Sequence, residues 1–252
     1  MSVEIRNGVA IHLEQLGEAG PPVVMLHGLF VGSMASWYFT AAPALAKTHR
    51  VLLYDLRGHG QSERPATGYD VATMAKDLEA IADAFSDRPI MLVGHSYGAV
   101  VALSYALTHP SRVSTLVMVE APLPPSRLEE LEAFARKSSS EMLAALPSAL
   151  TDSFARGGRR SQRLAASLDQ LATQTSLLAD LRSAHDIPDE ALASLRCKTL
   201  CIYGKTSSCL SVGERLARTI PHARLVTLEG GHFLPLEAPG DLTREIVEVA
   251  NA

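Results

Sequence analysis

Short, almost entirely apolar runs alternate with longer amphipathic stretches along most of the chain. A continuous apolar run indicates a strand buried on both faces, as in a parallel sheet covered by helices. Such runs occur at residues 23–26, 51–54, 90–93, 116–119, 200–203 and 225–228. Near the N-terminus, Asn7-Gly8 between residues 3–6 and 9–13 is a strong β-hairpin signal. The pattern therefore predicts a mainly parallel sheet and an N-terminal hairpin.

Amphipathic and apolar helical patterns lie between these runs. Apolar residues from Met74 to Phe85 recur at spacings of four, three and four, and Asp70 is a suitable N-cap for that helix. Residues 96–108 are small or apolar on all sides, which indicates a buried helix. A capping-box spacing at Ser211 and a pattern at 241–250 predict two later helices. Strands alternating with helices predict an α/β, doubly wound, mostly parallel architecture.

Residues 121–195 interrupt the alternation, because no strand-like run occurs there. Leucines between Leu164 and Leu181 recur as on one longer helix. The sheet pattern resumes at Thr199, which favours an insertion over a separate helical domain. We therefore expect a core built from 1–120 and 196–252, and a helical cap over the strand ends built from 121–195.

A G-x-S-x-G sequence, G-H-S-Y-G at residues 94–98, lies directly between an apolar run and a helix. In this setting the chain makes a sharp strand-to-helix turn that holds the serine in a strained backbone conformation. The hydroxyl is then presented at a helix N-terminus, where the helix dipole favours developing negative charge. Ser96 is therefore the candidate nucleophile.

Two further loops follow strand ends and complete a candidate catalytic set. The loop at residues 27–30 follows the first long apolar run, and the backbone N–H of Leu29 can pair with that of Tyr97 as an oxyanion hole. His27 is interpreted as a structural hydrogen-bonding residue. Of the 9 histidines, His232 is the best candidate base, because it follows Gly230-Gly231 at the end of the last apolar run.

The segment D-L-R-G-H-G-Q-S at residues 55–62 follows the second apolar run. Asp55 and Ser62 are suited to stabilise a tight loop through side-chain hydrogen bonds to the backbone. We interpret the segment as structural, with Asp55 as a catalytic acid kept as the alternative.

Together these stretches resemble the α/β-hydrolase superfamily, in the family's order and spacing. The resemblance rests on H-G-L at 27–29, D-L-R-G-H-G-Q-S at 55–62, G-H-S-Y-G at 94–98 and G-H at 231–232. It covers the chain outside residues 121–195, which correspond to the variable cap of that family. It implies an α/β-hydrolase fold with Ser96 as nucleophile, His232 as base, and Leu29 and Tyr97 as oxyanion donors.

The sequence departs from the family at the acid. Many members carry G-x-x-D after the penultimate strand, whereas residues 204–207 read G-K-T-S here. Ser207 cannot hold a negative charge against an imidazolium. Glu120, at the end of the run 116–119, is the natural replacement, because some members supply the acid from that neighbouring strand. Two alternatives to Glu120 as the acid remain open. The site can work as a Ser-His dyad, or Glu120 can serve only to stabilise the loop that enters the cap.

The resemblance implies a serine hydrolase of carboxylic esters, lactones or thioesters that acts through an acyl-enzyme on a small to medium, partly apolar substrate. The serine at position 96 argues against the dehalogenases and epoxide hydrolases of the superfamily, which need a carboxylate there. A C–C hydrolase or a lyase on the same scaffold, or a non-hydrolytic receptor-like protein, is the alternative. Phe30, Met34 and Trp37 follow the oxyanion loop and are predicted to line the substrate pocket.

Composition disfavours two classes of partner, nucleic acid and membrane, and a small-molecule substrate is the partner that we expect. Lys plus Arg is 23 and Asp plus Glu is 27, so the net charge of −4 favours neither nucleic acid nor an acidic membrane. Cys197, Cys201 and Cys209 are an odd number, without histidines at zinc-ligand spacing, so neither a disulfide framework nor a metal site is expected. No dinucleotide fingerprint, signal peptide or membrane span is recognised, so we expect no cofactor and a cytoplasmic location, with the oligomeric state open.

Overall fold

The computed structural model describes residues 2–123, 133, 136–138, 141–142 and 159–252. These residues form an eight-stranded sheet in the order β1-β2-β4-β3-β5-β6-β7-β8. Only the pairings of β2 with β1 and with β4 are antiparallel, and the strands from β4 to β8 pair in parallel. The strands are β1 Ser2–Arg6, β2 Val9–Leu16, β3 Pro22–Leu26, β4 Arg50–Tyr54, β5 Ile90–His95, β6 Val113–Val119, β7 Lys198–Gly204 and β8 Ala223–Leu228. The predicted doubly wound, mostly parallel sheet is confirmed.

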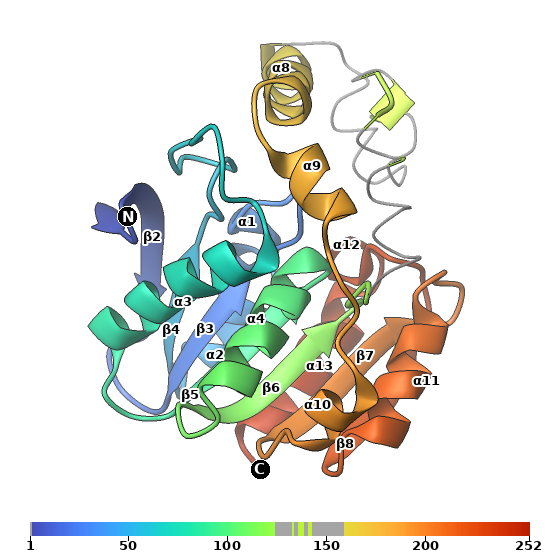
Figure 1. Cartoon of the computed structure of the whole chain (residues 1–252). Coiled ribbons are helices and arrows are strands. Elements are labelled where there is room, and N and C mark those ends of the chain that lie inside the picture. The colour runs from blue at the N-terminus through green and yellow to red at the C-terminus, as the bar shows by residue number, and fades with distance from the viewer. Residues whose placement is uncertain (1, 124–132, 134–135, 139–140, 143–158) are drawn as a thin grey trace.

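The apolar runs become strands because helices cover both faces of the sheet (Figure 1). In β3 the side chains alternate between two apolar cores, with Val24 and Leu26 in one and Val23 and Met25 in the other. Every residue of β3 and β5 is buried, so these strands carry no polar face to water. The two central strands therefore fix the position of the loops that follow them.

The helices divide between the two cores. Side chains of α3, α4 and α11 pack in one core, and those of α1, α2, α12 and α13 pack in the other. Figure 1 shows α3 and α4 in front of the sheet and α2 and α13 behind it. Their bounds are α1 Ala35–Tyr38, α2 Ala41–Leu45, α3 Val71–Phe85, α4 Tyr97–Thr108, α11 Leu210–Thr219, α12 Leu234–Glu237 and α13 Pro239–Ala250.

The helix α3 begins where the sequence predicts, whereas α11 begins earlier than predicted. The Asp70 carboxylate accepts a hydrogen bond from the Thr73 N–H at 2.9 Å, as expected for the N-cap of α3. The capping box expected at Ser211 does not form, because α11 already begins at Leu210 with Cys209 at its N-cap. There the Cys209 N–H donates to the Ser207 hydroxyl at 3.0 Å, which starts the helix earlier than the sequence pattern indicates.

The described part of residues 121–195 is helical. It contains α8 Arg159–Thr173, α9 Leu177–Arg182 and α10 Asp189–Ala193, and none of its described residues enters the sheet. The single long helix expected between Leu164 and Leu181 is wrong, since it is divided into α8 and α9. Figure 1 shows α8 and α9 beyond the strand ends. That residues 121–195 form an inserted cap over the site stays a prediction.

Hydrogen bonds join this helical segment to a loop of the core. The Tyr69 N–H donates to the Asp180 carboxylate at 2.8 Å, and the Ser176 N–H donates to the Ala66 carbonyl at 2.8 Å. The helix α9 is thereby held against the loop that precedes α3. Among the described helices, none has the length and apolar character needed to cross a membrane.

Candidate active site

Ser96 occupies the sharp turn between β5 and α4 that the sequence predicts. Its backbone has φ 53° and ψ −127°, a region that a non-glycine residue adopts only under strain. A Cβ on Gly98 would lie 2.3 Å from the His27 carbonyl oxygen, so only glycine allows this close approach of the next loop. The Ser96 N–H donates to the Val119 carbonyl at 2.8 Å and ties the turn to β6.

His232 lies within hydrogen-bond distance of the candidate nucleophile. Its Nε2 is 2.9 Å from the Ser96 Oγ, although the two residues are separated by most of the chain. The loop after β8 is held in place by His95, whose Nε2 lies 2.9 Å from the His232 carbonyl oxygen and donates to it. The two imidazole rings are 5.4 Å apart and tilted. His95 therefore packs against the His232 ring and also fixes the backbone of that residue.

Glu120 lies on the other side of the same imidazole. Its Oε2 is 3.2 Å from Nδ1 of His232, and its side chain is fully buried. The residue ends β6, the strand next to β5, and it adopts φ 55° while its N–H donates to the Ile202 carbonyl at 3.0 Å. The strained turn aims the carboxylate back over the strand ends. The distance expected between Glu120 and His232 is therefore confirmed.

Ser207 is close to this carboxylate and donates a hydrogen bond to it. The Ser207 hydroxyl binds Oε2 of Glu120, and the Gly204 N–H binds Oε1. Both carboxylate oxygens of Glu120 thus have a donor besides the imidazole. The serine in the G-x-x-D position therefore positions the Glu120 carboxylate and carries no charge of its own.

The surroundings of His232 favour its protonated form. Burial of the ring disfavours the charged imidazolium, but the contacts of the ring with Cys209 and Glu120 outweigh this effect and raise the pKa of His232 to about 9. For His95, burial and the nearby His232 lower the pKa to about 3. Of these two adjacent histidines, only His232 therefore holds an extra proton at neutral pH.

The backbone of the loop after β3 is shaped for an oxyanion hole. A Cβ on Gly28 would lie 3.0 Å from the Ser96 Cβ, so this loop lies directly against the nucleophile. The Phe30 N–H is engaged with Nε2 of His59 at 2.9 Å, and the Leu29 N–H stays the predicted donor of this loop. Tyr97 is the first residue of α4, where an N–H has no acceptor within the helix.

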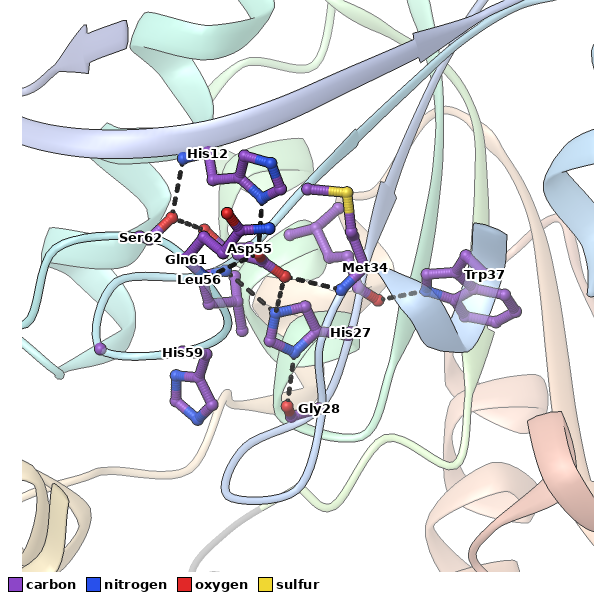
Figure 2. A network of polar contacts seen from close by, with 12 residues as sticks. His12, His27, Gly28, Met34, Trp37, Asp55, Leu56, His59, Gln61 and Ser62 are labelled. Atoms are coloured by element: carbon purple, nitrogen blue, oxygen red, sulfur yellow. Dashed lines mark hydrogen bonds and ion pairs between the residues drawn. The ribbon is translucent and has the colours of Figure 1, made fainter. Parts of the chain in front are cut away.

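A buried polar network beneath this loop holds its shape (Figure 2). The Asp55 carboxylate accepts hydrogen bonds from the Met34 N–H at 2.8 Å, the Gln61 N–H at 3.0 Å and Nδ1 of His12 at 2.8 Å. His27 accepts from the Leu56 N–H at 3.0 Å. Since burial lowers the pKa of His27 despite the nearby Asp55, this ring stays neutral. The structural interpretation of residues 55–62 is therefore supported by every contact of Asp55.

Comparison with known proteins agrees with this geometry. The family model for the alpha/beta hydrolase fold matches residues 21–239. The chain belongs to the alpha/beta hydrolase fold family. A crystal structure of the enol-lactonase from Burkholderia xenovorans LB400 superposes on this chain with a TM-score of 0.80 at 21% identity, over 100% of both chains. A thermophilic esterase from Thermogutta terrifontis superposes with a TM-score of 0.77 at 26% identity, covering 96% of this chain and 93% of that one.

Several curated relatives match about half of the chain. Epoxide hydrolase A of Mycobacterium tuberculosis is 36% identical over 132 residues, which is 51% of this chain and 41% of the relative. The chain spans less than two thirds of the length of the first curated relatives that it matches. The family model therefore establishes the family, and the activity of this chain is a separate question.

Two of the predicted pocket residues belong to the core instead. Trp37 is fully buried, and its indole N–H donates to the Leu26 carbonyl at 2.8 Å. Met34 is buried in the same core, and its N–H is bound to Asp55. Both side chains pack in the core on the other face of the sheet from Leu29 and Phe30, which argues against the prediction that they line the pocket. Phe30, packed in the other core with Leu29, stays a predicted pocket residue.

Sequence reasoning missed two contributors near the base. Ser207 was considered only as a missing acid, and its hydrogen bond to Glu120 was not foreseen. Cys209 was not assigned any role, yet its side chain lies beside the imidazole of His232. Its place at the N-cap of α11, two residues after Ser207, is the one signal in the sequence for this proximity.

Proposed function

We propose that this protein is a serine hydrolase of carboxylic esters, lactones or thioesters, with its acid relocated to Glu120. The observation that carries the proposal is the continuous hydrogen-bonded relay in which His232 joins the Ser96 hydroxyl at 2.9 Å to the Glu120 carboxylate at 3.2 Å. A hydroxyl, an imidazole and a carboxylate in this order form the constellation that activates serine for acyl transfer. The constellation is recognised by its geometry and not by the position of its acid in the sequence.

In the proposed reaction, the Ser96 Oγ attacks the substrate carbonyl carbon while Nε2 of His232 takes the hydroxyl proton. Glu120 holds the Nδ1 proton, selects the tautomer and stabilises the imidazolium that forms. The N–H groups of Leu29 and Tyr97 bind the oxyanion of the tetrahedral intermediate. His232 then gives its proton to the leaving group, and water hydrolyses the acyl-enzyme by the same steps in reverse order.

The nucleophile supports ester hydrolysis over epoxide opening. In this family an epoxide hydrolase needs a carboxylate where this chain has Ser96, so the epoxide hydrolase relative does not determine the chemistry here. Similarity to a thermophilic esterase at 26% identity agrees with the proposal. The predicted substrate is a small or medium-sized, partly apolar molecule, and the predicted location is cytoplasmic.

The test is turnover of p-nitrophenyl acetate and butyrate by the purified protein. Ser96→Ala should abolish turnover, whereas the matched control Ser104→Ala, further along α4, should retain it. A fluorophosphonate should add one label, at Ser96. Labelling at another residue, or no labelling of folded protein, would reject Ser96 as nucleophile and favour a receptor-like protein. A lyase or C–C hydrolase would be labelled at Ser96 without turning over the esters.

A further inference from the structure

Three side chains that can bind a metal ion lie close together at the site of the proposed function. Two of them, Glu120 and His232, belong to the proposed catalytic relay, and the third is Cys209. One ligand atom each from Glu120, Cys209 and His232 lies within 4.8 Å of the other two. They come from the end of β6, the N-cap of α11 and the loop after β8. Spacing along the chain indicates no metal site at the cysteines. The fold nevertheless brings one of them to a carboxylate and an imidazole.

The set of donors is the kind that binds zinc. A thiolate sulfur, an imidazole nitrogen and a carboxylate oxygen are the three protein ligand types of Zn²⁺, at about 2.3, 2.0–2.1 and 2.0–2.2 Å respectively. Magnesium and calcium prefer oxygen ligands and a larger coordination number, so a thiolate disfavours them. With these three protein ligands, a tetrahedral ion would keep a fourth position for water.

Hydrogen bonds hold the three residues in place, either at the side chain or at the backbone. Glu120 is fixed by donors on both oxygens, and the Cys209 backbone is fixed by the Ser207 hydroxyl. The His232 backbone is fixed by His95. Of the three side chains only that of His232 has appreciable exposure, 26%, so an ion reaches the cluster along the imidazole.

We propose that Glu120, Cys209 and His232 form an inhibitory Zn²⁺ site. The ion takes the position of the Nδ1 proton between the imidazole and the carboxylate. As it binds, the imidazolium releases that Nδ1 proton to solvent and keeps the proton on Nε2, and the Cys209 thiol releases its own proton to solvent. An imidazole that coordinates zinc through this side no longer has Glu120 as its hydrogen-bonded acid. The inhibitory part of the inference rests on the proposed function, because it requires His232 to be the base. The binding part does not.

Binding is tested without any substrate. Purified protein, freed of metal with a chelator, is titrated with Co²⁺, whose thiolate bond gives a charge-transfer absorption band in the near ultraviolet. Zn²⁺ should displace Co²⁺ and remove the band. Cys209→Ser and Cys209→Ala should abolish the band and weaken Zn²⁺ binding at least about tenfold. The matched control is Cys197→Ser, another buried thiol, which should leave both unchanged.

Inhibition is tested on the same proteins. Micromolar Zn²⁺ should slow p-nitrophenyl butyrate hydrolysis by the wild type and by Cys197→Ser, and a chelator should restore the rate. The rate of Cys209→Ser, measured relative to its own zinc-free rate, should lose this sensitivity. Unchanged Co²⁺ absorption and Zn²⁺ affinity in folded Cys209→Ser and Glu120→Gln would overturn the site. Zinc binding through Cys209 without inhibition of an active enzyme would overturn the inhibitory role.

An inactive wild type would instead remove the proposed function and leave the binding result standing. Circular dichroism of each variant separates the loss of a ligand from the loss of the fold. Because two substitutions at Cys209 and one at Glu120 are compared, misfolding of a single variant leaves the test decisive.

Discussion

Around His232, one carboxylate and one hydroxyl have different tasks. Glu120 is the charged neighbour of Nδ1, whereas Ser207 donates to that carboxylate and accepts from the Cys209 N–H. Glu120→Gln should keep the shape, remove the charge and permit the wrong imidazole tautomer. Losing the acid costs about 10⁴ in kcat in the serine-protease example, and here we expect a loss on the order of 10²–10⁴. Steady-state kcat on p-nitrophenyl butyrate measures it.

Ser207→Ala is the comparison for this prediction. It removes one of several hydrogen bonds to Glu120 and leaves the charge in place, so kcat should change far less than in Glu120→Gln. Nearly full turnover in Glu120→Gln, together with loss of turnover in Ser207→Ala, would contradict the relocated acid. If neither substitution matters, a Ser96–His232 dyad is the better account.

The raised pKa of His232 predicts a pH dependence. A general base must be neutral, and the pKa of His232 is about 9, so kcat/KM should rise with pH until the ring is deprotonated. Glu120→Gln removes a negative charge that favours the imidazolium, so the pKa should fall and the rise should move to lower pH. The measurement is kcat/KM of the wild type and variant between about pH 6 and 10. An unchanged midpoint in the variant would show that Glu120 does not act on His232 in solution.

At the residue scale, the sequence identified the groups whose position follows from strand order. Ser96 follows β5, Glu120 follows β6, and adjacent strands in a parallel sheet end at the same edge. The environment of His232 is different, because Ser207 and Cys209 reach it only through the way the chain turns after β7. Such a contact between loops leaves no periodic pattern in the sequence, so it could not be predicted.

At the scale of elements, the loop after β3 must approach the turn that carries Ser96. In Gly28→Ala the new Cβ would lie 3.0 Å from the Ser96 Cβ and 3.3 Å from Nδ1 of His95. We expect the loop to shift and kcat to fall about 10–10²-fold, below the 10²–10³ of removing an oxyanion donor outright. Gly240→Ala, where nothing lies within 4 Å, is the control. Full activity in Gly28→Ala would contradict this close packing.

The same scale shows why strands were easier to predict than helix ends. Burial on both faces makes each parallel strand a continuous apolar run, and every predicted long run lies in a strand. The leucine pattern did not reveal the break between α8 and α9, because Leu171 and Leu177 on either side of it pack into the same core. The break is stabilised by Thr175, whose hydroxyl donates to the Leu171 carbonyl at 2.5 Å and accepts from the Leu177 N–H at 3.2 Å.

At the scale of the whole molecule, the sheet separates two cores with different tasks. One core packs beneath the helical segment and contains Leu29, Phe30 and Tyr97 beside the site. The other contains Met34 and Trp37 and supports the same loop from behind the sheet. Trp37, which packs in the second core, therefore contributes to stability. Its position in the sequence, next to the predicted oxyanion loop, had suggested contact with the substrate.

Substitution of Trp37 tests whether the second core contributes to stability and not to substrate binding. Trp37→Phe removes the indole N–H that binds the buried Leu26 carbonyl and leaves that oxygen without its donor. We expect the free energy of unfolding to fall by about 1–3 kcal/mol, with KM for p-nitrophenyl butyrate unchanged. Urea unfolding and steady-state kinetics measure the two effects. Phe39→Leu, at a side chain that is 79% exposed, should change stability by no more than about 0.5 kcal/mol. A raised KM with unchanged stability in Trp37→Phe would return this residue to the substrate pocket.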